Sequence, residues 1–482
     1  MRRRSTPAFV ALALLPALAI PLAAVAMSDG RRAPSFARDV APVIAEKCAG
    51  CHQAGGIAPF SLEKANEISS RAPLIAAAVR SGRMPPWPPG RRSPAFVGRS
   101  QRTLTARERE AIVAWAVRGG RVDGPAGKPR APARVPVRPG ESVLDLRLPT
   151  AFRPTARKGA TDDYRCFLLD PRLTKDAAVT SARIVPGQPR VVHHVILFRV
   201  SREQVAEAKR LDAGAAGPGW TCFGGTGLSL GADGGSIQAA LGDANWVAAW
   251  APGRDGDRLP DGTGVPLPAG SQIVMQVHYN LLNGRAPDRS RAVLTVAPST
   301  AGLAPLQTML LPGPVELACA RGESGRLCGR TDALFELVRK YGAEAGFVPA
   351  GLLLLCGRSA SAPRASAVSS CDRRLSSPAT IHVVAGHMHL LGASIRVTLN
   401  PGTPRQRVLL DIPRWDFHWQ NAYVLARPVR ARPGDVVRVT CRHDVGKRRA
   451  GLPGIPQEPR YVLWGEGTTD EMCLGILQVT RG

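Results

Sequence analysis

Residues 272–282 read QIVMQVHYNLL, a run of β-branched and other apolar residues that favours a β-strand. Successive side chains of a strand point to opposite faces, so Gln276 and His278 share one face while Val277 turns towards a core. Comparable runs, separated by turns that contain Gly and Pro, occur at 191–200, 380–384 and 436–441. The fold class predicted for this part of the chain is antiparallel β, arranged as two β-sandwiches.

Further histidines lie in short motifs of the same β region. His387 and His389 are two residues apart, so on a strand both rings project from one face and can share a metal ion. His193 and His194 are adjacent, and they can bind one metal only at a twisted strand end or a bulge. Taken alone, that pair is explained equally well by core packing or an ordinary hydrogen bond. The remaining histidines of the region lack such neighbours and are expected to be structural: His382, His418 and His443.

The segment 465–473, GEGTTDEMC, places the thioether of Met472 beside Cys473 near the C-terminus. Soft sulfur together with imidazole favours copper, particularly Cu(I), over zinc. The histidine motifs and Met472 therefore predict copper centres.

The motif Cys48-Ala49-Gly50-Cys51-His52 predicts one covalently bound haem c near the N-terminus. Two thiols at this spacing can add to the haem vinyl groups, and the adjacent histidine then reaches the iron from one side. Apolar spacing predicts a helix leading into the motif, a second near 73–80 and a third over 105–117. Three helices around such a motif are typical of a small all-α class I cytochrome c domain.

The second axial ligand of this haem is predicted to be Met84, in the segment SGRMPPW at 81–87. Met84 is the only methionine between Met27 and Met275, and two prolines restrict its loop. Thioether ligation raises the reduction potential, which suits an electron carrier. The alternative is an ordinary apolar methionine beside an open face of the haem.

The first 26 residues have the pattern of a secretory signal peptide. Arg2, Arg3 and Arg4 precede an apolar run over 8–22, and Ala24-Val25-Ala26 supplies small residues for cleavage. An uncleaved N-terminal anchor is the alternative. No second run of about 18 apolar residues follows, so we expect no stable membrane span after cleavage. Export and covalent haem together predict the bacterial periplasm.

Eight cysteines lie outside the haem motif, an even number that predicts disulfides in an oxidising compartment. No CxxC pair occurs among them, which argues against a zinc ribbon or a thioredoxin-type site. Three of the pairs are predicted to be Cys166–Cys222, Cys356–Cys371 and Cys319–Cys328.

The formal net charge of +27 is spread along the chain as arginine, without a basic stripe, so a nucleic-acid partner is not expected. A proline-rich basic linker, PAGKPRAPARVPVRPG, covers 125–140. It separates a cytochrome c domain at 34–124 from two copper-binding sandwiches at 141–305 and 306–482. A helix over 332–341, with Thr331 as N-cap, interrupts the strands.

In chain order the motifs of the β region are His-His, Gln-x-His, His-x-His and Glu-Met-Cys. Four motifs in this order, over about 144–480, resemble the copper type II monooxygenases. The resemblance implies two eight- or nine-stranded sandwiches with one copper each. It also implies oxygen activation at the Met-containing copper, insertion of oxygen into a substrate C–H bond, and an additional electron from the other copper.

The resemblance also assigns roles to individual residues. The ligands of the electron-storing copper would be His193, His194 and His278, and those of the oxygen-binding copper would be His387, His389 and Met472. Gln276 and Met472 would be the catalytic residues, with Gln276 between the two centres. Cys441 would be the disulfide partner of Cys473.

The chain departs from the family pattern at several positions. Members that bind a peptide carboxylate have an arginine, an asparagine and a tyrosine where this chain has Ala385, Leu474 and Ile476. A glycine-extended peptide is therefore not expected as the substrate. Val200 replaces a cysteine that follows the first histidine pair in the family, so the disulfides of the first sandwich should differ.

The function predicted from these motifs is a periplasmic, haem-fused, two-copper monooxygenase. It would use O2 to hydroxylate an aliphatic or benzylic C–H bond of an unidentified small molecule. A redox partner would reduce the haem, which would dock beside the first sandwich and feed the copper of His193, His194 and His278. The alternatives are a non-catalytic electron-transfer or copper-binding protein, and a fusion that merely co-localises two independent proteins.

Overall fold

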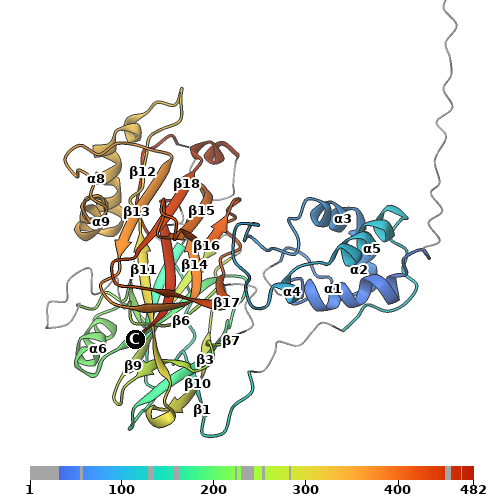
Figure 1. Cartoon of the computed structure of the whole chain (residues 1–482), viewed down its shortest axis with the longest axis horizontal. Helices are drawn as coiled ribbons and strands as arrows, with labels where there is room; N and C mark the ends of the chain where they lie inside the picture. The colour runs from blue at the N-terminus through green and yellow to red at the C-terminus, as the bar shows by residue number, and fades with distance from the viewer. Residues whose placement is uncertain are drawn as a thin grey trace, which may run out of the picture.

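A computed structural model describes residues 32–54, 58–128, 135–155, 162–222, 225–229, 244–251, 256–281, 284–450, 458–467 and 469–482. The expected signal peptide (1–26) lies outside these residues, as does the middle of the expected linker. Figure 1 shows a helical N-terminal module beside two stacked β-sandwiches. Among the described helices, none combines the length and the apolar character that crossing a membrane requires.

The N-terminal module is built around a small apolar core. Phe36 packs on Trp115, with ring centroids 5.5 Å apart. Lys47 and Glu108 form an ion pair of 2.8 Å that joins the first and last long helices, and Thr105 forms a capping box with Glu108. The helices are η1 (Phe36–Val40), α1 (Ala41–Lys47), α2 (Ala65–Ser70), α3 (Ala72–Arg80), α4 (Arg99–Arg102) and α5 (Ala106–Val117).

The first sandwich packs two sheets around a core that includes Leu197, Met275, Val277 and Leu294. One sheet contains β1 (Ser142–Arg147), β10 (Arg291–Pro298), β3 (Ala177–Val185), β8 (Thr263–Leu267) and β7 (Asp257–Arg258). The other has the order β5 (Trp220–Thr221), β2 (Asp162–Leu169), β9 (Gln272–Asn280), β4 (Val192–Val200) and β6 (Trp246–Trp250). Two helical segments follow β4: η2 (Arg202–Gln204) and α6 (Val205–Ala213).

The second sandwich has its own core, which includes Ile381, Ile395, Val439 and Leu477. One sheet has the order β11 (Ala304–Pro312), β20 (Leu474–Arg481), β14 (Ala379–His387) and β17 (Ala422–Ala431). The other has the order β13 (Val368–Arg374), β18 (Val436–His443), β15 (Gly392–Leu399) and β16 (Arg407–Ile412). The remaining elements are β12 (Glu316–Leu317), β19 (Val462–Leu463), η4 (Ser299–Ala301), η5 (Arg326–Cys328), η6 (Val445–Ala450), α8 (Arg330–Tyr341) and α9 (Ala343–Leu355).

A parallel contact joins the two halves into one sheet. Ala304 and Pro305 of β11 pair with Thr263 and Gly264 of β8, so the sheet runs from β1 to β17 across both sandwiches. The strand patterns predicted antiparallel sheets, and most pairings are antiparallel. The β8–β11 pair is an exception that the patterns did not indicate.

Two helix expectations need correction. The helix expected at 332–341 begins at Arg330 with Gly329 as N-cap, so Thr331 lies inside it and does not cap it. Helix α9 follows directly and was not expected. It contains Pro349 and a run of four leucines, so its sequence lacks the alternation of apolar and polar residues by which a surface helix is predicted.

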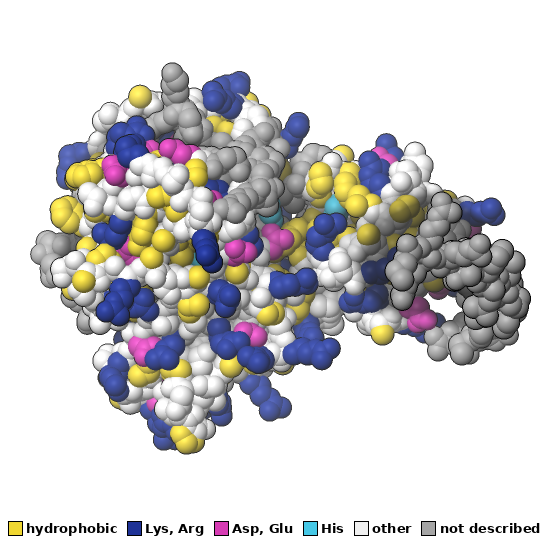
Figure 2. All heavy atoms as spheres, turned by 90° about the horizontal axis from the view of Figure 1, so that it is seen from above, with side chains coloured by type: hydrophobic (Ala, Val, Ile, Leu, Met, Phe, Trp, Pro, Cys, Tyr) yellow, Lys and Arg dark blue, Asp and Glu magenta, His cyan; other side chains and the backbone are white. Residues whose placement is uncertain are grey.

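Four disulfides stabilise the β region, and they indicate folding in an oxidising, secretory environment. Their pairs are those named from the sequence: Cys166–Cys222, Cys319–Cys328, Cys356–Cys371 and Cys441–Cys473. Lys and Arg side chains are scattered over the face shown in Figure 2 and do not gather into one stripe.

The N-terminal module docks on the second sandwich, which corrects the expectation that it lies beside the first. Phe96 forms an antiparallel bridge with Leu425 of β17, and the Val97 amide donates to the Val424 carbonyl at 2.9 Å. Phe96 and Trp87 both pack on Tyr423, at centroid distances of 5.1 and 5.6 Å. Apolar side chains and an open sheet edge therefore favour this position, and linker length alone could not reveal it.

Candidate metal centres

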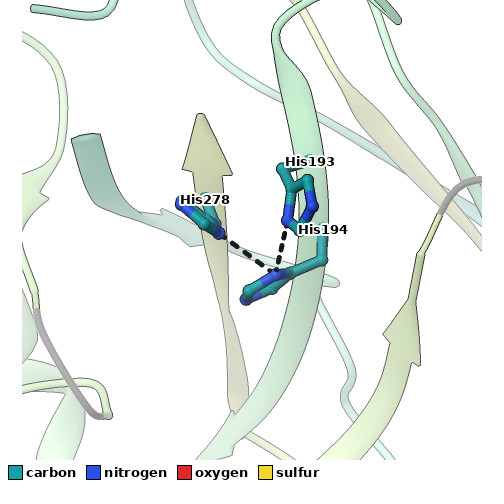
Figure 3. A group of neighbouring side chains, drawn as sticks. All are labelled: His193, His194 and His278. Atoms are coloured by element: carbon teal, nitrogen blue, oxygen red, sulfur yellow. Dashed lines mark hydrogen bonds between the residues drawn. The ribbon is translucent and has the colours of Figure 1, made fainter. Parts of the chain in front are cut away.

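The first candidate centre lies between β4 and β9 (Figure 3). His194 and His278 face each other across the two strands, and a register shift between Val192 and His194 supplies the bulge that the adjacent histidines require. The His194 Nδ1 atom lies 3.3 Å from His193 Nδ1 and 3.2 Å from His278 Nδ1. One ring nitrogen of each residue can therefore reach a single ion, since all three lie within 4.8 Å of one another.

The surroundings fix the rings of this centre. His278 Nε2 lies 2.8 Å from an Asp162 carboxylate oxygen, which orients the ring and leaves Nδ1 for a metal. Tyr164 stacks on His278 at 4.1 Å, and Phe417 of the second sandwich stacks on His193 at 4.9 Å. Burial lowers the pKa of His193 and of His194 well below the ordinary value, so both are neutral and able to bind a cation.

The second candidate centre lies where β14 ends. His387 is the last residue of the strand, and His389 lies beyond the strand end rather than on the strand as expected; their Nε2 atoms are 3.2 Å apart. The other ring nitrogens are already bonded: His387 Nδ1 to the Gln420 side-chain oxygen, and His389 Nδ1 to the Asp470 carbonyl at 3.2 Å. Burial lowers the pKa of His387 to about 3, so its ring is neutral. Both Nε2 atoms can thus serve one ion.

Glu471 organises this centre from beneath. Its buried carboxylate accepts hydrogen bonds from the backbone amides of His389 (3.0 Å), Leu391 (2.5 Å) and Met472 (3.2 Å). It therefore fixes the His-x-His segment and the methionine to each other. The next residue, Cys473, is held by the disulfide to Cys441 on β18.

Both centres open into one cavity of about 480 Å³ between the sandwiches. His194, His387, His389 and Met472 all line it, and the His194 and His387 rings lie 6.5 Å apart between centroids. Most of the wall is apolar. It includes Ile184, Trp246, Trp250, Leu310, Val348 and Leu352.

Gln276 also lines the cavity, on the same face of β9 as His278. Its Nε2 atom donates to the Gly225 carbonyl at 2.8 Å and lies 3.7 Å from the sulfur of Cys222. The side chain is therefore held beside the Cys166–Cys222 disulfide.

The donor sets of the two centres fit copper. Three imidazoles form the first, and two imidazoles with a buried thioether in the same cavity are available at the second. Imidazole suits Cu(II) and Cu(I), and thioether sulfur favours Cu(I). Asp162 and Gln420 supply the outer hydrogen bonds that metal-binding histidines usually have.

The cysteine motif of the helical module fits a covalent haem. Neither Cys48 nor Cys51 forms a disulfide, whereas the other eight cysteines are paired. His52 is buried, and its Nδ1 atom lies 3.1 Å from the Phe60 carbonyl, which leaves Nε2 for an iron. Met84 is half-buried in the segment between α3 and Trp87.

The histidines expected to be structural have different surroundings. His382 Nε2 lies 3.0 Å from the Thr480 hydroxyl, and His418 pairs with Asp416 at 3.1 Å. His443 is different, because its Nε2 atom lies 3.3 Å from the Met472 carbonyl and 3.5 Å from the Glu471 carboxylate. It therefore supports the second centre directly.

Several residues of the site had no motif to reveal them. Asp162, Tyr164, Phe417 and Gln420 come from segments distant in the sequence and meet the histidines only in the folded chain. Glu471 stands beside Met472, and that proximity was the one available signal.

Comparison with known proteins identifies one part of the chain. Residues 362–478 match the family described as copper type II ascorbate-dependent monooxygenase, C-terminal domain. No relative among the curated proteins matches the chain.

Similar solved structures include the major capsid protein P2 of bacteriophage PM2, at 8% identity and a TM-score of 0.23, covering 71% of this chain and 98% of that one. Another is an allantoicase, at 10% identity and a TM-score of 0.15, covering 68% of this chain and 90% of that one. Scores this low carry no argument about fold or function.

Proposed function

Residues 362–478 belong to the copper type II ascorbate-dependent monooxygenase family, and from this premise we propose that the chain is a two-copper monooxygenase. The first copper would be held by His193, His194 and His278, and the second by His387, His389 and Met472. The substrate would be a small molecule that is hydroxylated at a C–H bond with O2. The observation that carries the proposal is the opening of both ligand sets into one cavity.

When bound, copper would supply one-electron chemistry and oxygen activation. The chain's own residues position that chemistry. Asp162 and Gln420 orient His278 and His387, and Glu471 fixes the backbone that carries His389 and Met472. The apolar wall limits water, so reduced oxygen is less exposed to side reactions.

The cavity also supports a substrate class. Ala385, Leu474 and Ile476 replace the residues with which some family members bind a peptide carboxylate, and all three line the cavity. None of these three can pair with an anion, and Arg258, the one guanidinium on the described wall, is already paired with Glu141 at 2.7 Å. The substrate proposed is therefore an uncharged, mostly apolar molecule with an aliphatic or benzylic C–H bond.

The helical module is proposed to be a periplasmic cytochrome c that delivers electrons from a redox partner. Its haem would be held by Cys48, Cys51 and His52, with Met84 as the second axial ligand. Trp87 follows Met84 by three residues and contacts Tyr423 at the start of β17. Gln420 precedes that strand and bonds to His387, so the docked module favours delivery to the second centre rather than the first.

The test is oxygen consumption by copper-loaded, reduced protein with a panel of apolar candidate substrates. We expect two copper ions per chain and a hydroxylated product that incorporates oxygen from O2. Stoichiometric zinc without copper after copper-replete growth would contradict the proposal. Copper binding without oxygen consumption would instead favour an electron-transfer or copper-binding protein.

The haem has an independent test. Covalently attached haem should stay with the denatured protein through acid–acetone extraction, because Cys48 and Cys51 would form thioether bonds. Loss of haem in that extraction would exclude a haem c. Met84→Ala should lower the reduction potential and open the iron to exogenous ligands.

A further inference from the structure

Glu466 is the only carboxyl group among the described residues that line the cavity. It lies in the segment between β19 and β20, six residues before Met472. The other polar groups on the described wall are histidines, amides, hydroxyls, indole N–H groups and one guanidinium: His194, His387, His389, Gln276, Gln420, Asn421, Gln478, Thr308, Tyr164, Trp246, Trp250, Trp464 and Arg258.

The position of Glu466 connects it to the first centre, and it shares the cavity wall with the ligands of the second. The Tyr164 hydroxyl donates to the Glu466 backbone carbonyl at 3.0 Å, and the Tyr164 ring stacks on His278 of the first centre. No hydrogen bond links the Glu466 carboxyl group to another described side chain. The carboxyl is therefore available to a molecule in the cavity.

The surroundings keep this carboxyl group protonated. Burial, followed by the nearby Asp470 carboxylate, raises the pKa of Glu466 to about 8. Burial raises the pKa of Asp470 as well, while Lys340, the Tyr341 hydroxyl and the Gly467 amide at 3.1 Å act in the opposite direction. At neutral pH, Glu466 thus presents an O–H donor to an apolar cavity.

We propose that Glu466 donates a proton to oxygen during the reaction in this cavity, a role that rests on the proposed monooxygenase function. The overall reaction is R–H + O2 + 2 e⁻ + 2 H⁺ → R–OH + H2O, with both electrons supplied by reduced copper. The O–H bond of Glu466 breaks, and its proton joins the oxygen atom that leaves as water. The resulting carboxylate regains a proton from bulk water, which also supplies the second proton.

The first test compares Glu466→Gln with the matched control Glu336→Gln in the full, copper-loaded chain. Glu336 lies on α8 outside the cavity and pairs with Arg339. Because a positioned acid typically contributes about 10²- to 10⁴-fold, we expect Glu466→Gln to slow oxygen consumption by at least about 10²-fold. Copper content should stay unchanged, and Glu336→Gln should behave like the wild type.

The pH profile gives a second readout. An acid must be protonated to donate, so the wild-type rate should fall as pH rises through about 8. The residual rate of Glu466→Gln should not change across that range. Glu466→Asp keeps an acid with a shorter reach, and should retain the pH dependence at an intermediate rate.

Infrared difference spectroscopy of the copper-free chain tests the protonated carboxyl without turnover. A protonated carboxyl band should vanish as pH rises through about 8 in the wild type and in Glu336→Gln, and should be missing in Glu466→Gln. A wild type that consumes oxygen no faster than Glu466→Gln would overturn the donor role alone. A copper-loaded wild type that consumes no oxygen would overturn the proposed function and this role with it.

Discussion

The two candidate centres are built on different parts of their sandwiches. The first lies within a ladder of paired strands, where β4 and β9 present three imidazoles and Asp162 fixes one ring. The second lies beyond the end of β14, where Glu471, a disulfide and backbone amides hold two imidazoles near a thioether.

Under the proposed function, this difference suits two kinds of task. Three nitrogen donors on hydrogen-bonded strands resist rearrangement, which suits a centre that only gains and loses an electron. Two imidazoles with a weak sulfur donor leave coordination positions free, as a centre that binds a small molecule requires. The second centre is also more accessible to a molecule in the cavity. His387, His389 and Met472 all line the cavity wall, whereas His194 is the one ligand of the first centre that does so.

The largest expected effect comes from removing one ligand of the second centre. His387→Ala should abolish oxygen consumption and reduce copper from two ions per chain to one, while the first centre stays loaded. Metal analysis and an oxygen electrode measure both. His382→Ala is the matched control, since His382 contacts Thr480 outside the cavity wall. Loss of both coppers in His387→Ala would show that the centres do not bind independently.

The next effect concerns the carboxylate beneath the second centre. Glu471→Gln replaces one acceptor oxygen with an amide that faces backbone donors, so we expect the free energy of unfolding to fall by about 2–4 kcal/mol. Denaturant titration measures this change. Glu458→Gln is the control, because Glu458 is 60% exposed and should change stability by less than about 0.5 kcal/mol. Equal stability of the two variants would contradict the organising role of Glu471.

A smaller effect is expected at the first centre. Asp162→Asn should weaken copper binding there by about 10- to 100-fold, because the outer hydrogen bond to His278 loses its charge. Competition titration with a copper chelator should show no change at the second centre. Asp163→Asn is the neighbouring control, since the Asp163 carboxylate accepts from the Thr155 amide and not from a histidine. A similar loss in both variants would assign the effect to the strand rather than the ring.

The smallest effect should come from the contact between the module and the second sandwich. Trp87→Ala removes an edge-on contact with Tyr423 worth about 1 kcal/mol, which corresponds to about a fivefold change in docking. Stopped-flow oxidation of reduced haem should slow by a comparable factor. Val97→Ala is the control, since Val97 is 62% exposed on the same segment. Unchanged haem oxidation would argue against electron delivery through this contact.

The spacing of residues along the sequence predicted the features that local backbone geometry determines, namely strands and a bulge. Period-two patterns gave the strands of His278 and His387, and the adjacent pair His193-His194 called for a bulge that the β4–β9 register contains. The family match over 362–478 confirms the resemblance for the part of the chain that carries the His-x-His and Glu-Met-Cys motifs.

The sequence could not predict contacts between segments that are distant along the chain and meet only after folding. Asp162 reaches His278 across 116 positions, and Phe417 stacks on His193 from the other sandwich. The expected position of the module was wrong because it relied on linker length, while the decisive contacts come from Trp87 and Phe96.

The bridge between Phe96 and Leu425 also affects how readily the protein aggregates. β17 is the last strand in the order of the large sheet, and the segment around Phe96 covers part of its open edge. Uncovered edges that carry apolar residues template pairing between molecules. If the sandwiches were expressed without residues before 125, Tyr423 and Leu425, now 4% and 3% exposed, would lose this cover. By covering this edge, the helical module should also limit aggregation. We therefore expect the shortened chain to precipitate at concentrations at which the full chain stays in solution.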